Sequence, residues 1–104
     1  MSYNEAVYTI NQTQIFRAWL HKVRDKNAQT RIIARIRNAE AGNLGDSQPV
    51  GEGVSEMRVH IGAGYRVYYT MTGKTIILLL VGGDKSTQQG DIRRAIHMAR
   101  QLRQ

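Results

Sequence analysis

The sequence predicts a single α+β domain of 104 residues. Two segments in its N-terminal half carry apolar residues at helical spacing, and the stretch 56–69 alternates apolar and polar residues as strands do. A nearly continuous apolar run at 75–83 then precedes a third amphipathic segment. A chain of this length supports one modest core, and no repeat or linker divides it. We therefore expect one domain over residues 1–104.

The N-terminal half predicts one strand and two helices. Residues 6–10 favour a short strand because they contain β-forming side chains. Apolar residues at helical spacing predict a helix over 14–24, with Thr13 available as its N-cap. A second helix is expected over 28–41, where Gly42 is placed to end it.

The C-terminal half predicts a loop, three strands and a helix. Residues 42–53 are rich in glycine and contain the only proline, so we expect a long surface loop there. The hairpin 56–69 follows, and the apolar run 75–83 is typical of a central strand buried on both faces. The segment 86–89 fits a capping box and predicts a last helix over 91–102.

The hairpin carries cations at alternate positions. A three-residue turn at 62–64 pairs Ile61 with Tyr65 and thereby sets the expected register. The polar face then gathers Arg58, His60, Arg66 and Tyr68. An ordinary solvated sheet face is one interpretation of this pattern. Glu56 is the single acidic residue in the hairpin, so little relieves the repulsion between these cations, which favours a surface that binds an anion.

The charge balance points to a polyanionic partner. Fifteen Lys and Arg against eight Asp and Glu give a net charge of +7, and eleven of the fifteen are Arg, whose planar fork matches phosphate. We expect either nucleic acid or an acidic protein segment. The two N-terminal helices widen this positive footprint, with a solvated surface as the alternative interpretation. Their candidate RNA-binding residues are Arg17, Arg35 and Arg37.

Several protein classes are disfavoured. The chain has no Cys, which excludes a disulfide framework and a thiolate metal site, and its three histidines share no ligand spacing. No apolar run approaches the roughly eighteen residues of a membrane span, and residues 1–10 lack the features of a leader peptide. We expect a cytoplasmic protein with no cofactor, no metal and no membrane contact.

Cleavage of a phosphodiester without a metal fits the remaining residues. RNA supplies its own nucleophile, the 2′-hydroxyl, so the protein needs to move protons and to stabilise charge on phosphorus. The candidates for charge stabilisation are Arg58, Arg66 and Lys85. His60 and Asp91 are the available acid–base groups. Tyr68 is expected either to stack on a base or to fill the sheet.

The stretches EMRVHIGAGYRVYY (56–69) and ILLLVGGDKSTQQGDIRRA (77–95) resemble the RelE/ParE superfamily of type II toxins, specifically its HigB-like addiction module killer branch. The resemblance implies an α+β, RelE-like (microbial-ribonuclease-like) fold of order β-α-α-β-β-β-α, with an antiparallel sheet and helices packed on one face. It also implies an mRNA interferase, a ribosome-dependent endoribonuclease that cuts mRNA in the ribosomal A site and so inhibits translation. A cognate antitoxin, often of the helix-turn-helix type, would neutralise it.

The resemblance also assigns roles by position. It implies that Arg66 is the arginine that stabilises phosphate, that Arg58 and Lys85 match basic positions of the family, and that Asp91 lies near a position used in acid–base catalysis. Two departures stand out. Residues 90–92 hold no counterpart of the catalytic tyrosine near the C-terminus of RelE. RelE also has a pair of lysines before the turn, whereas this sequence has Glu56 and Arg58 at the comparable positions.

Two alternative functions are compatible with the same surface. One is a ParE-like inhibitor of DNA gyrase, and the other is a non-catalytic module that binds RNA or the ribosome. An inhibitor of gyrase needs no set of residues directed at phosphate, so the grouped cations favour the nuclease. We further expect the antitoxin to bring acidic and apolar residues to this surface, covering the basic hairpin face or displacing the final helix.

Overall fold

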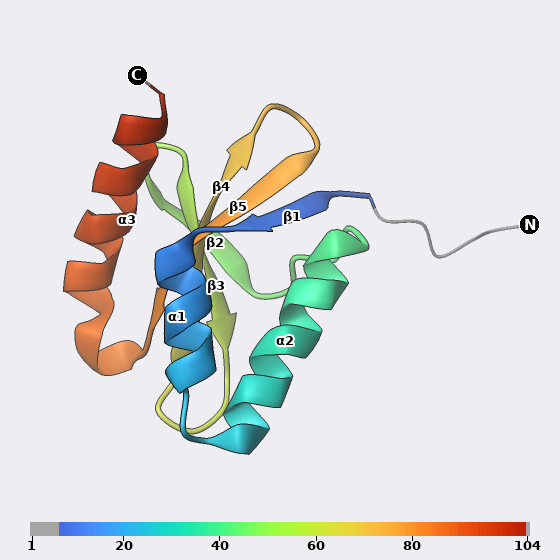
Figure 1. Ribbon diagram of the computed structural model, residues 1–104, viewed down its shortest axis with the longest axis vertical. Coiled ribbons are helices and arrows are strands. Elements are labelled where there is room, and N and C mark those ends of the chain that lie inside the picture. The colour runs from blue at the N-terminus through green and yellow to red at the C-terminus, as the bar shows by residue number, and fades with distance from the viewer. Residues whose placement is uncertain (1–6, 104) are drawn as a thin grey trace, which may run out of the picture.

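The computed structural model describes residues 7–103 (Figure 1). The elements are β1 (Thr9–Gln12), α1 (Gln14–Lys22), α2 (Lys26–Glu40), β2 (Ser47–Gly51), β3 (Val54–Val59), β4 (Tyr65–Thr72), β5 (Ile76–Gly83), the short 3-10 helix η1 (Lys85–Thr87) and α3 (Gln88–Leu102). This arrangement confirms the predicted α+β class. No helix among these residues is both long enough and apolar enough to cross a membrane.

The strands form one sheet in the order β1-β5-β4-β3-β2. Consecutive strands from β2 to β5 pair antiparallel, as expected, whereas β1 fills the free edge of β5 in the parallel sense. Strand β5 therefore has a neighbour on both sides, which confirms the central position predicted for the apolar run 75–83. Both faces of its middle section are buried.

Two hydrophobic clusters hold the helices to the sheet. Helices α1 and α2 pack together on one face, where Phe16 and Ile32 meet strand residues such as Val67. Alternate strand residues, among them Tyr68, form the second cluster with Ala95 and its neighbours in α3. Figure 1 shows the central strands between α3 and α2. The sheet thus directs alternate side chains into two separate hydrophobic clusters, one with α1 and α2 and the other with α3.

Helix starts follow the capping chemistry of the sequence. The side chain of Thr13 accepts a hydrogen bond from the backbone N–H of Phe16 at 3.0 Å, which confirms the predicted N-cap. Asp25 accepts in the same way from Ala28, so α2 begins at Lys26, two residues before the predicted start.

The hairpin register and the expected loop are corrected by the structure. Val59, rather than Ile61, pairs with Tyr65, because the turn contains more residues than the three expected. Residues 47–51 of the predicted loop form the edge strand β2, where Pro49 is tolerated because an edge strand needs no donor on its outer side.

Two element ends also differ from the predictions. The first strand covers 9–12 rather than 6–10, and residue 6 of that prediction lies outside the described residues. The capping box joins Asp84 and Thr87 around η1 instead of 86–89, so α3 begins at Gln88. The last helix therefore starts directly beside the end of β5, close to the hairpin turn.

Candidate functional site

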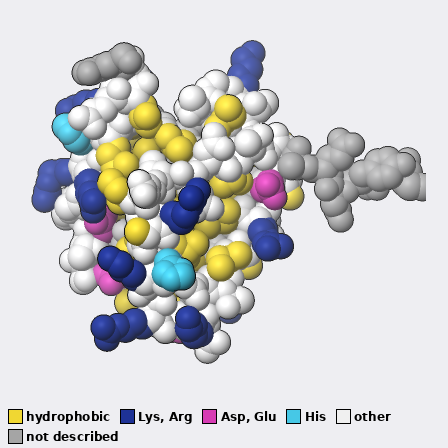
Figure 2. Space-filling model, in the orientation of Figure 1, with side chains coloured by type: hydrophobic (Ala, Val, Ile, Leu, Met, Phe, Trp, Pro, Cys, Tyr) yellow, Lys and Arg dark blue, Asp and Glu magenta, His cyan; other side chains and the backbone are white. Residues whose placement is uncertain are grey.

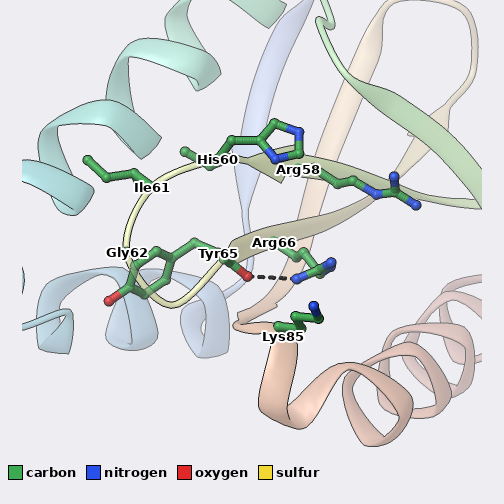
Figure 3. Close-up of a pocket in the computed structure, with 9 residues that line it drawn as sticks. Arg58, His60, Ile61, Gly62, Tyr65, Arg66 and Lys85 are labelled. Carbon is green, nitrogen blue, oxygen red and sulfur yellow. Dashed lines mark hydrogen bonds between the residues drawn. The ribbon is translucent and has the colours of Figure 1, made fainter.

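A hollow of about 450 Å³ opens around the turn between β3 and β4 (Figure 3). It is lined by Arg58, Val59, His60, Ile61, Gly62, Gly64, Tyr65, Arg66 and Lys85. Of the five residues predicted to carry chemistry, the structure brings four together here: Arg58, His60, Arg66 and Lys85. They come from the two hairpin strands, the turn and the start of η1.

The backbone places these cations close to one another. Arg58 and Arg66 occupy directly opposed positions in the antiparallel pair of β3 and β4, where like charges repel. Lys85 is held at the turn because its backbone N–H donates to the carbonyl of Ala63. An ideal Cβ at Gly64 would lie 3.4 Å from Arg66 Nη1 and 3.5 Å from Lys85 Cβ, so both side chains border this glycine.

A buried carboxylate relieves the repulsion between the two arginines. Glu56 is fully buried and accepts a hydrogen bond from Arg58 Nε at 3.1 Å. Its other oxygen accepts from Tyr68 Oη at 3.1 Å and from Gln88 Nε2 at 2.9 Å, and lies 3.4 Å from Arg66 Nε. Burial works to raise the pKa of Glu56, but these hydrogen bonds and the charge of Arg66 together lower it.

The terminal nitrogens of Arg58 and Arg66 remain at the hollow, because the Glu56 carboxylate lies against the Nε atom of each guanidinium group. Arg66 Nη1 donates to the carbonyl of Gly64 at 2.7 Å, the bond dashed in Figure 3, and the Arg66 side chain is 13% exposed. The Arg58 side chain is 32% exposed. Two guanidinium groups held in this way can bind the oxygens of a phosphate with little further ordering.

His60 has a carboxylate partner that the sequence did not indicate. His60 Nε2 lies 2.5 Å from Asp46 Oδ2. The hydrogen bond with His60 lowers the pKa of Asp46, so this carboxylate acts only as an acceptor and Nε2 is the donor. Nδ1 is then the ring nitrogen that this hydrogen bond leaves unused. Asp46 lies in the segment 42–53, which was expected to be a long surface loop.

Tyr68 is not available for stacking on a base, which corrects one of its two predicted roles. Its side chain is fully buried under α3, where the hydroxyl donates to Glu56. Burial and the neighbouring carboxylate raise the pKa of Tyr68, so the phenol stays protonated. The aromatic ring that does line the hollow is Tyr65, which alternation along β4 places toward Trp19 of α1.

Asp91 lies outside the residues that line the hollow. Its carboxylate accepts a hydrogen bond from Thr87 Oγ1 at 2.5 Å. It packs over Gly83, where an ideal Cβ would lie only 1.8 Å from Asp91 Oδ2. Gly82 likewise leaves space for the ring of Trp19. The pair of glycines at the end of β5 therefore accommodates packing on both faces of the sheet.

The arginines predicted on the helices do not form one surface with the hollow. Arg35 donates to the carbonyl oxygens of Arg58 and Leu44 and so fastens the segment before β2 to the end of β3. Arg17 and Arg37 line other hollows, beside α1 and α2. On the face of the molecule drawn in Figure 2, basic side chains are spread around apolar patches, with few acidic side chains among them.

Within residues 7–103, no group of three or more His, Cys, Asp or Glu side chains is arranged to hold a metal ion. The candidate site is therefore described by its cations, its imidazole and the carboxylates behind them. Three of its contributors were missed by sequence reasoning: Asp46, Gln88 and Tyr65. Gln88 has no distinguishing pattern, whereas Tyr65 follows the glycine turn directly and its alternation with Arg66 could have indicated it.

Residues 18–104 match the model of a family described as Phage derived protein Gp49-like (DUF891). The chain belongs to this family. A protein of Haemophilus influenzae whose name is "Uncharacterized protein" is 42% identical over 93 residues, which are 89% of this chain and 94% of that protein. No solved structure matches the chain. The Gp49-like family is a toxin family of toxin–antitoxin systems, which supports a toxin with a cognate antitoxin.

Proposed function

We propose that this Gp49-like protein is a ribosome-dependent endoribonuclease that cuts mRNA in the ribosomal A site without a metal. The observation that carries the proposal is the hollow at the hairpin turn, where Arg58, Arg66 and Lys85 surround one space with His60 beside them. Cations fixed before the reaction stabilise the negative charge that develops on phosphorus. RNA itself supplies the attacking 2′-hydroxyl.

The arrangement suggests a role for each group. Arg58 and Arg66 bind the non-bridging oxygens of the scissile phosphate, and Glu56 holds both guanidinium groups in place. His60 Nδ1 accepts the proton of the 2′-hydroxyl as its oxygen bonds to phosphorus, and Asp46 stabilises the imidazolium that forms. The bond to the 5′-oxygen breaks and Lys85 donates a proton to that leaving oxygen. The products are a 2′,3′-cyclic phosphate and a 5′-hydroxyl.

The experiment is primer extension on an mRNA being translated in a purified system. The wild type is compared with Arg66→Ala, with Arg93→Ala as a matched arginine on the exposed side of α3, and with a reaction that lacks ribosomes. We expect cuts only when ribosomes are present, a loss of about 10²-fold or more in Arg66→Ala, and no loss in Arg93→Ala. Circular dichroism checks that each variant is folded.

Absence of cuts with folded wild-type protein would overturn the nuclease. The supercoiling activity of DNA gyrase would then be assayed. Inhibition of gyrase is the alternative function that the resemblance to the RelE/ParE superfamily offers, and it requires no RNA cleavage. Cuts that persist in Arg66→Ala would instead remove this hollow as the active site.

We also propose that the antitoxin is of the helix-turn-helix type and brings acidic residues to the surface around the hollow. A net charge of +7 steers such a partner by long-range attraction. Mixing the two proteins in a stopped-flow instrument at increasing salt concentration should show a falling association rate. A rate that does not change with salt would contradict the steering.

A further inference from the structure

The hollow has an apolar half as well as a cationic half. In Figure 3, Ile61, Gly62 and Tyr65 lie on one side of the turn, and the tips of Arg58, Arg66 and Lys85 lie on the other. An anion alone would need only the cations. The apolar half therefore indicates a ligand that carries a flat or apolar group next to its phosphate.

The Tyr65 ring packs against Trp19 on one side and lines the hollow on another. Trp19 of α1 packs against it with ring centroids 6.3 Å apart, and Phe16 in turn packs against Trp19 at 5.6 Å. An ideal Cβ at Gly62, whose φ is +54°, would lie 3.2 Å from Asp25 Oδ2 and 3.6 Å from Tyr65 Cε2. A side chain at that position would therefore begin to cover the ring. Glycine leaves the ring half-buried and reachable from the hollow.

The two halves are joined by the glycine turn. Neighbours on a strand point to opposite faces, so Tyr65 and Arg66 direct their side chains to either side of the hairpin end. Gly62 and Gly64 lie between them without side chains that would block a chain passing over the turn. A strand of nucleic acid crossing here would place a phosphate at Arg66 and an adjacent base at Tyr65.

We propose that the apolar half of the hollow is a nucleobase site, in which an unpaired base of single-stranded RNA stacks on Tyr65 beside Ile61 while the neighbouring phosphate is bound by Arg66 and Lys85. This inference rests on the proposed function for the identity of the ligand as RNA. Stacking on an aromatic ring accepts any base, so the site adds affinity and register without choosing a sequence.

The test is equilibrium binding without ribosomes. The probes are a 2′-O-methyl tetranucleotide, which cannot be cleaved, and an abasic chain with the same number of phosphates. The proteins are the wild type, Tyr65→Phe, Tyr65→Leu and the control Tyr8→Leu, which alters a half-buried tyrosine beside β1. Fluorescence anisotropy reports each dissociation constant.

We expect wild type, Tyr65→Phe and Tyr8→Leu to bind the base-bearing probe about tenfold more tightly than the abasic one. In Tyr65→Leu the difference should disappear while binding of the abasic chain is unchanged, which shows that the fold and the phosphate half are intact. Equal binding of the two probes by the wild type, or a difference that survives Tyr65→Leu, would overturn the base site.

The two proposals fail in different ways. If the nuclease is wrong, translating ribosomes yield no cuts while base-dependent binding persists. If the base site is wrong, cleavage is kept in Tyr65→Leu and no probe difference is seen.

Discussion

Glu56 and Arg58, two residues apart on β3, are joined by a hydrogen bond of 3.1 Å between a fully buried carboxylate and a partly exposed guanidinium. The same carboxylate lies 3.4 Å from Arg66 Nε, opposite Arg58 in the sheet. One buried negative charge thus holds two positive charges at a distance that they would not keep alone. The candidate site depends on a residue that no bound molecule is expected to touch.

Replacing Glu56 by Gln should weaken the fold and the site together. The amide keeps the shape of the side chain but leaves the two arginines without their shared counter-charge. We expect the free energy of unfolding to fall by about 2–4 kcal/mol. This loss is smaller than for a fully buried ion pair, because the Arg58 side chain is partly exposed to solvent. Urea unfolding measures it. Glu52→Gln is the matched control, because its pair with Arg100 is exposed and should change stability little. Equal losses in both variants would contradict the argument.

Stability should also depend on acid pH through Glu56. The pKa of Glu56 is lowered in the folded protein relative to its ordinary value of 4.5, so the unfolded chain binds its proton first as the pH falls. Its contribution is therefore complete above about pH 4.5 and is lost as the pH falls through the lower folded value. Urea unfolding between pH 3 and pH 7 checks this. The wild type should lose more stability below pH 4.5 than Glu56→Gln does, and parallel curves would refute the assignment.

The elements that were predicted well are those whose burial leaves a period in the sequence. Phe16 and Ile32 lie on helix faces where apolar residues recur every three to four positions. The run 75–83 is almost entirely apolar because both faces of that strand are covered. Thr13 was found because N-capping is a local interaction between a side chain and the backbone next to it.

The errors concern contacts that the period does not determine. A slip of two residues in the hairpin keeps every side chain on its own face, so the pairing of Tyr65 with Ile61 and its pairing with Val59 fit the pattern equally. Tyr68 lies on the face expected for it, but the sequence does not say that α3 covers that face. Nothing local connects Asp46 with His60, which is fourteen residues away.

The glycine after the middle of β5 should not tolerate a methyl group. An ideal Cβ at Gly82 would lie 2.2 Å from Trp19 Cε3, so Gly82→Ala must push the partly buried indole out of its place against the core. Overpacking of this kind costs about 1–3 kcal/mol, which thermal unfolding detects. Gly90→Ala in α3 is the control, because its nearest neighbour would be 3.8 Å away and alanine favours helix by about 0.5 kcal/mol. A Gly82→Ala protein as stable as the wild type would show that Trp19 moves freely.

If Asp46 acts through His60, the two residues should not contribute independently to cleavage. His60→Ala should lower the single-turnover rate on translating ribosomes by about 10²-fold or more, since it removes the proton acceptor. Asp46→Asn should cause a smaller loss, because the imidazole remains but its charged form loses the carboxylate that stabilises it. In the His60→Ala background, Asp46→Asn should have no further effect. If Asp46→Asn instead lowers the rate by the same factor in both backgrounds, Asp46 acts on the RNA or the ribosome directly and the pairing with His60 is only structural.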